Sequence, residues 1–126
     1  MFCNDLNNIL SLIVATIFAD KRVYDSEIDT FVKSTASLKI AKKLEPKLSR
    51  TRLLVWYDAN QNDIRKKLET PYFKDWFYEL LDKLATVQGK RAILKVMDDI
   101  ARADGEVHVS ERALITLAER HWGLTT

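Results

Sequence analysis

Apolar side chains recur every three or four positions along most of this chain, which is the spacing of one face of an α-helix. Ile28, Phe31 and Val32 form one such stripe. No stretch shows the sustained alternation between turn residues that marks hairpin strands. The pattern predicts an all-α fold, a compact single domain of about six or seven helices. The expected helices cover about residues 5–19, 27 onward, 39–44, 53–57, 71–87, 90–103 and 111–121.

Several helix ends carry residues typical of caps. Thr70 is expected to cap a helix that begins at Pro71, because proline suits the first helical position. Gly123 is expected to end the last helix in the left-handed conformation that glycine adopts most easily. Asp98 and Arg102 lie four residues apart and are expected to form an ion pair on the solvent-exposed face of their helix.

A nine-residue motif occurs twice. The segment from Ala19 to Glu27 aligns with the segment from Ala103 to Glu111, 84 positions later, and five of the nine residues are identical. Ile9 and Leu10 also match residues 93 and 94 at the same offset. In each copy an apolar helix ends in Ala-Asp, a short turn follows, and a new helix opens at Ser-Glu. The chain is therefore expected to contain two repeat-related helix-turn-helix units, one at each end.

Most residues of the motif have a structural explanation. Ser26 and Ser110 are placed to cap the helices that follow, a contribution of about 0.5–2 kcal/mol. Glu27 and Glu111 then fall in the first turn, where a carboxylate interacts favourably with the helix dipole. Val23 and its counterpart at position 107 are expected to anchor the turns in the core.

The two aspartates of the motif have two explanations. Asp20 and Asp104 lie in the last turn of a helix, where the dipole disfavours a negative charge, so each needs a compensating partner. One candidate is an Asx-type hydrogen bond to N–H groups of the turn. The other is a shared hard cation such as calcium or magnesium, bound by both aspartates together with Glu27 and Glu111.

The motif is not an EF-hand. That loop needs oxygen donors at fixed positions and a glutamate at the twelfth. Counting from Asp20, the twelfth residue is Phe31, and counting from Asp104 it is Ile115. Any metal site must therefore be assembled between the two copies.

The composition indicates a single globular domain without disulfides or a membrane-spanning segment. The chain has 126 residues, 47% hydrophobic and 30% charged, which suits one domain over residues 1–126 with a real core. Its single cysteine, Cys3, can form no internal disulfide, which indicates a reducing, cytoplasmic location. The 14 uncharged residues from Leu6 to Ala19 fall short of the roughly 20 needed to span a bilayer. This segment is expected to be a buried core helix.

The repeated pattern Ala-Asp-Gly-Glu-Val-x-x-Ser-Glu between helices, in an all-α domain of this length, resembles the TerB-like proteins, named for tellurite resistance. The resemblance covers about residues 6–32 and 93–124; the first copy departs from it at Lys21, where the family usually has glycine. The resemblance implies a helical domain, often cytoplasmic, linked to stress responses or membrane-associated complexes and without enzymatic activity. The acidic residues that it implies as a metal site map onto Asp20, Glu27, Asp104 and Glu111.

The middle of the chain is basic. Residues 33–67 contain ten lysines and arginines against three acidic residues, a net charge of +7 in a chain of +2. With Trp56 and Tyr57 nearby, this segment could bind an acidic partner or an anionic membrane surface. The overall charge is too small for a dedicated nucleic-acid binder.

No catalytic motif is present: the chain lacks a Gly-rich phosphate loop, a nucleophile elbow and a paired-histidine motif. His108 is expected in a turn and His121 near a helix C-terminus. The sequence thus favours a non-enzymatic TerB-like binding or scaffolding module with a protein partner, no required cofactor, and a candidate divalent-cation site. The alternative is an interaction domain whose acidic turns are structural and whose basic middle contacts the partner.

Overall fold

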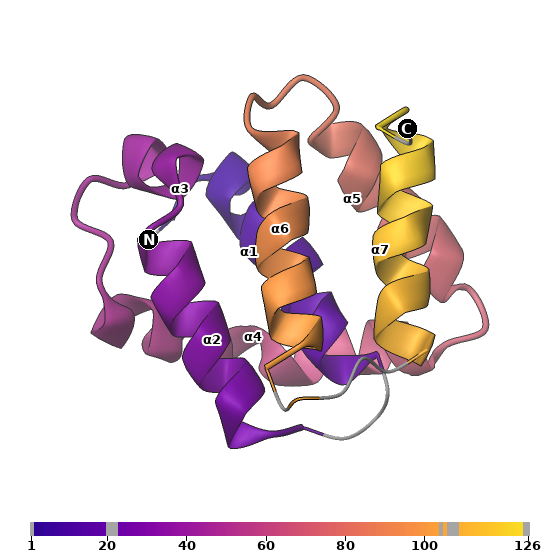
Figure 1. Cartoon of the computed structure of the whole chain (residues 1–126), viewed down its shortest axis with the longest axis horizontal. Helices are drawn as coiled ribbons and strands as arrows, with labels where there is room; N and C mark the ends of the chain where they lie inside the picture. The colour runs from indigo at the N-terminus through magenta and orange to yellow at the C-terminus, as the bar shows by residue number, and fades with distance from the viewer. Residues whose placement is uncertain (1, 20–22, 104, 106–108, 125–126) are drawn as a thin grey trace.

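The computed structural model describes residues 2–19, 23–103, 105 and 109–124, and within them the chain forms helices and no strands (Figure 1). The all-α prediction is confirmed. The helices are α1 (Asn4–Phe18), α2 (Asp25–Ala36), α3 (Lys39–Leu44), α4 (Arg50–Glu69), α5 (Phe73–Lys83), α6 (Lys90–Ala101) and α7 (Val109–His121).

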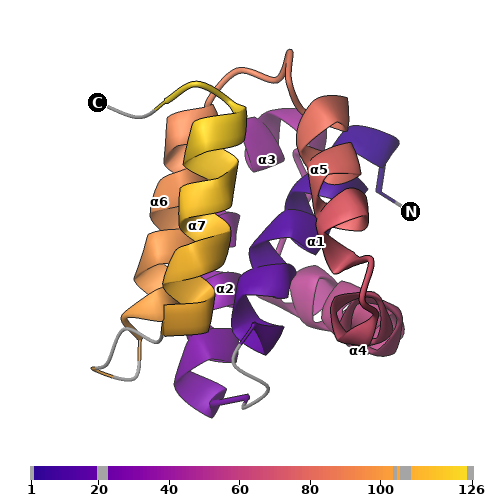
Figure 2. The same ribbon diagram turned by 90° about the vertical axis from the view of Figure 1, so that its right-hand side faces the viewer.

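Helix α1 lies at the centre of the molecule. Every residue from Leu12 to Phe18 is buried, as expected for a helix that is apolar all round. It contacts every other helix described. Figure 2 shows α1 between α6 and α7 on one side and α4 and α5 on the other. The prediction of a buried core helix is confirmed, and no helix in the described part of the chain has the length and apolar character needed to cross a membrane.

Aromatic residues connect the outer helices to α1 and to one another. The ring of Tyr57 on α4 lies 6.0 Å from that of Phe18 on α1 and 6.1 Å from that of Phe31 on α2. The indole N–H of Trp56 donates to Asn7 at 2.9 Å, which ties α4 to the start of α1. The indole of Trp122 donates to the carbonyl of Leu81 at 2.9 Å and holds the end of α7 on α5.

Two predicted details of the helices are confirmed. Gly123 has a φ of 69°, and the next amide N–H, that of Leu124, donates to the carbonyl of Glu119 at 2.8 Å, which is the Schellman pattern. Arg102 pairs with Asp98 at 2.9 Å.

Three predicted helix starts are wrong. Thr70 ends α4, with its hydroxyl donating to the carbonyl of Lys67 at 2.9 Å, and α5 begins only at Phe73. Ser26 and Ser110 are each the second residue of their helices, so they are not caps. In α2 the first turn is fixed instead by Glu27.

Candidate functional site

Both copies of the motif fold as a helix, a connection and a second helix. The first unit is α1 followed by α2, and the second is α6 followed by α7. The ends of α1 and α6 and the starts of α2 and α7 lie at the same end of the molecule (Figures 1 and 2). The topology therefore brings the described parts of the two motifs to one end of the fold.

Glu27 is the third residue of α2 and is fully buried, with 0% of its surface exposed. Its Oε1 accepts a hydrogen bond from the backbone N–H of Tyr24 at 3.1 Å. This contact satisfies a donor that the helix itself cannot satisfy, as the glutamate of a capping box does. It also fixes the direction in which the carboxylate points.

Glu111 is the third residue of α7 and is also 0% exposed. Val109 and Ser110, which precede it, are both exposed, so Glu111 is the only buried residue among the first three of α7. The two glutamates occupy the same helical position in the two units. Carboxylates are rarely fully buried, because burial of the charged form costs several kcal/mol unless hydrogen bonds, an opposite charge or a metal compensate it.

The charge of Glu27 reaches the neighbouring helix α4. Burial raises the pKa of the Tyr57 hydroxyl above its usual 10.0; the nearby Arg65 opposes this shift, while Asp58 and Glu27 add to it. Glu27 therefore lies within electrostatic reach of the core between α2 and α4.

The remaining predicted ligands, Asp20 and Asp104, lie outside the described residues. Among the residues that are described, no group of three or more histidines, cysteines, aspartates or glutamates is close enough to hold a metal ion. The structure thus places Glu27 and Glu111, and both the shared-cation and the Asx-turn explanations of the aspartates stay predictions.

The basic middle segment does not form one aromatic-lined surface. Its lysines and arginines spread over α2, α3 and α4, and Trp56 and Tyr57 are both buried. Arg65 lies over the ring of Phe18 at 4.7 Å, and Arg52 pairs with Glu45 at 3.2 Å. Trp56 and Tyr57 therefore do not form part of a binding surface with the basic charges. Exposed lysines lie together on α3 (Lys42, Lys43) and near the end of α4 (Lys66, Lys67).

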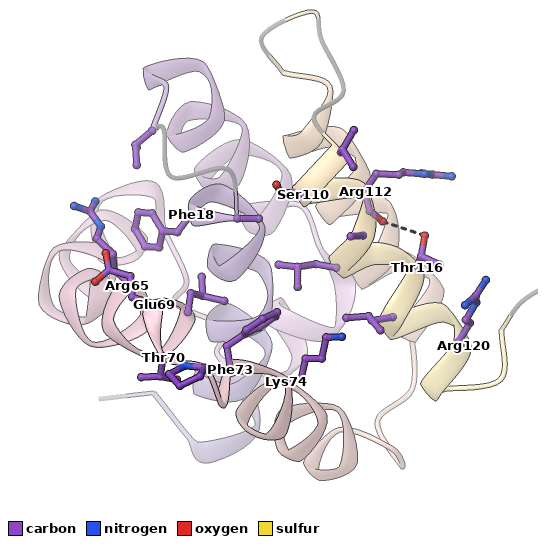
Figure 3. A pocket seen from close by; sticks show the side chains of 18 residues that line it. Phe18, Arg65, Glu69, Thr70, Phe73, Lys74, Ser110, Arg112, Thr116 and Arg120 are labelled. Atoms are coloured by element: carbon purple, nitrogen blue, oxygen red, sulfur yellow. Dashed lines mark hydrogen bonds between the residues drawn. The ribbon is translucent and has the colours of Figure 1, made fainter.

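A groove that the motifs did not predict adjoins this end of the molecule (Figure 3). It has a volume of about 1320 Å³ and lies between the last residues of α1 and α4, the start of α5, and α7. Val23, expected as a core anchor, is 38% exposed and lines the groove instead; its counterpart at position 107 lies outside the described residues.

The described histidine has a structural contact. His121 Nε2 lies 2.6 Å from Asp82 Oδ1, and its ring stacks on Tyr78 with centroids 4.9 Å apart. These contacts join the end of α7 to α5. His108 lies outside the described residues.

Comparison with known families gives one result. The family model described as tellurite resistance protein TerB matches residues 7–126. No curated protein and no solved structure matches the chain. The family match includes the basic middle segment, which the sequence motifs alone did not cover.

Proposed function

This chain belongs to the TerB family, and on that basis we propose that it is a non-enzymatic binding or scaffolding module that holds a divalent cation between its two acidic turns. The ligands are Asp20, Glu27, Asp104 and Glu111, and the cation is calcium or magnesium, which both prefer oxygen donors. The proposal includes a cytoplasmic location, a protein partner, and a role in tellurite resistance or a related stress response.

One observation carries the cation proposal. Glu27 and Glu111 are both fully buried, at the same helical position, in two repeated units that meet at one end of the fold. A capping contact accounts for the position of each glutamate in its own helix, so what supports a shared cation is the repetition of buried glutamates at one end of the fold. In the sequence, an aspartate stands seven residues before each of them.

Thermal melts with calcium, magnesium, manganese or zinc, each against excess chelator, test this proposal. An ion that binds only the folded state stabilises it, by about 2.7 kcal/mol at one hundred times the dissociation constant. We expect calcium or magnesium to raise the melting temperature of the wild type. Glu111→Gln should weaken the ion's affinity by roughly tenfold or more, because the site loses an anionic oxygen donor.

The matched control is Glu79→Gln, which removes a carboxylate from the exposed surface of α5. It should respond to the ions as the wild type does. Asp104→Asn separates the two explanations of the aspartates: a cation ligand loses ion binding, whereas an Asx turn keeps much of its hydrogen bonding and shows no ion-dependent change. An unchanged melting temperature with every ion would remove the cation from the proposal.

The basic segment supports a second candidate. Lys39, Lys42 and Lys43 are exposed on the short helix α3, where they could contact an acidic partner or anionic membrane surface. Vesicles containing phosphatidylserine test this candidate in a flotation assay. Binding should disappear in the Lys42→Glu/Lys43→Glu variant, and equal binding by wild type and variant would contradict it.

A further inference from the structure

The groove beside α7 has an apolar floor built from four helices. Phe18 at the end of α1, Leu68 near the end of α4 and Phe73 at the start of α5 face Leu114 and Leu117 of α7. Figure 3 shows Phe18 and Phe73 on one side of the groove and α7 along the other. Val109, 86% exposed, continues this apolar surface at one end. Phe18 and Leu114 are each only 4% exposed, so the apolar surface open to a ligand comes from the partly exposed Leu68, Phe73 and Leu117 together with Val109.

The walls of the groove are basic. Among the described residues that line it, Arg65 and Lys74 stand on the side of α4 and α5, Arg112 and Arg120 belong to α7, and Glu69 is the acidic residue. Figure 3 shows the Arg112 side chain pointing away from Phe18 and Phe73, so Arg120 is the basic residue that α7 offers to the groove. Arg65 is held over Phe18, and Arg112 is paired with Asp98 at 3.1 Å. Within the described part of the chain, Lys74 and Arg120 form no ion pair, so their charges remain available to a ligand.

The length of the groove suits a helix. Residues of α7 from Val109 to Arg120 line it, which corresponds to about 17 Å or three turns at the helical rise of 1.5 Å per residue. A partner helix laid along α7 would bury one apolar stripe in the floor and present its polar flanks to the two walls. Acidic flanks would complement Lys74 on one side and Arg120 on the other.

We propose that this groove binds an amphipathic helix of a partner protein whose polar flanks carry glutamates or aspartates. A fatty acid fits less well, because it has one anionic head group, whereas Lys74 and Arg120 belong to two different helices that line the groove, α5 and α7. The proposal deepens the binding role proposed above by giving the chemistry of the partner, and it does not depend on the cation.

Selection from a displayed peptide library tests the proposal directly. The library contains helices of about 18 residues with apolar residues at every third or fourth position and either glutamate or lysine at the others. Selection on the full chain in excess chelator should enrich glutamate-rich helices. Enrichment of lysine-rich helices, or of peptides without helical periodicity, would overturn the proposal.

Charge-reversal variants then locate the binding site. With a selected peptide labelled with fluorescein, fluorescence anisotropy should show a loss of affinity of about tenfold or more for Lys74→Glu/Arg120→Glu, because two walls change sign. The variant Lys83→Glu/Arg91→Glu makes the same change of net charge at exposed positions of α5 and α6, outside the groove, and should bind within about twofold of wild type. Equal losses in both variants would mean non-specific attraction and refute the groove.

A steric variant tests the floor independently of the walls. Ala113→Glu places a bulky acid at an exposed position of α7 inside the groove and should abolish peptide binding, while Ala59→Glu on the exposed face of α4 should leave it unchanged. Both proteins should keep their helical circular dichroism. Oleate that displaces the peptide and binds more tightly would assign the groove to lipid and overturn the helix.

The two proposals can fail separately. An ion-dependent rise in melting temperature without any selected acidic helix would keep the cation and refute the groove. Selected helices that bind equally in chelator and in calcium, with no ion effect on melting, would keep the groove and refute the cation.

Discussion

Thr16 is a polar residue in the most apolar part of the molecule. It lies on α1 between buried aliphatic residues and is fully buried. Within the described residues its hydroxyl has no hydrogen-bond partner. A buried hydroxyl without a partner loses its hydration and gains nothing in return.

Replacing this hydroxyl by a methyl group should therefore stabilise the protein. We expect Thr16→Val to raise the free energy of unfolding by about 1 kcal/mol, since a buried polar group without a hydrogen-bond partner costs roughly 1–3 kcal/mol. Urea denaturation followed by circular dichroism measures the change. Thr86→Val, at an exposed position, is the control and should change stability by less than about 0.5 kcal/mol. A destabilised Thr16→Val protein would show that the hydroxyl has a partner after all.

At the scale of the helices, the end of α7 is set by backbone conformation. Gly123 has a φ of 69°, and no atom lies within 4 Å of the position that a Cβ would take. A side chain at this position would therefore meet open space, and its cost would come from the left-handed backbone alone.

Gly123→Ala should lower the free energy of unfolding by about 1 kcal/mol, because left-handed backbone costs an L-residue roughly 1–2 kcal/mol. Gly123→Asn should cost less, since asparagine tolerates this region better than alanine. Thermal melts of both variants measure the difference. Equal stability of alanine and wild type would contradict the Schellman end described for α7.

The order of the helices follows from hydrophobic spacing, but three of their starts do not. Ser26 and Ser110 carry the residue type of a cap, yet α2 begins one residue before Ser26 and α7 one residue before Ser110. A serine cap contributes only about 0.5–2 kcal/mol, so the contacts of Glu27 and its neighbours decide the first turn instead. Helix α4 was predicted only around residues 53–57, because few of its residues face the core: Leu53, Trp56, Tyr57 and Ile64.

The part of the candidate site that lies within the repeated motif could be predicted from the sequence. Glu27 and Glu111 stand out because the motif repeats, and a repeat is visible along the chain. The groove was not predictable in this way. Phe18, Leu68 and Leu117 are about 50 positions apart, and each has the spacing of an ordinary core residue. Only the tertiary packing of α1, α4 and α7 shows that they share a surface.

At the scale of the whole molecule, stability depends on α1. Ile13 is fully buried at the middle of this helix, which contacts every other described helix. We expect Ile13→Ala to lower the free energy of unfolding by about 2–5 kcal/mol, through lost burial and the cavity left behind. Because all helices share this contact, tryptophan fluorescence and circular dichroism should report one coincident transition.

Leu54→Ala is the control for this change. Leu54 is a partly exposed leucine on α4, and its truncation should cost much less than that of Ile13. Two separate transitions in the Ile13→Ala protein would mean that the helices on the two sides of α1 unfold independently.

The central place of α1 also determines what happens while the chain is being made. Helix α1, which is the most buried, is translated before the other described helices, and α6 and α7, which help to cover it, follow about 75 and 90 residues later. At roughly 5–20 residues per second, a ribosome leaves the apolar segment without its final neighbours for several seconds. During that interval the nascent chain exposes apolar surface that the finished fold buries.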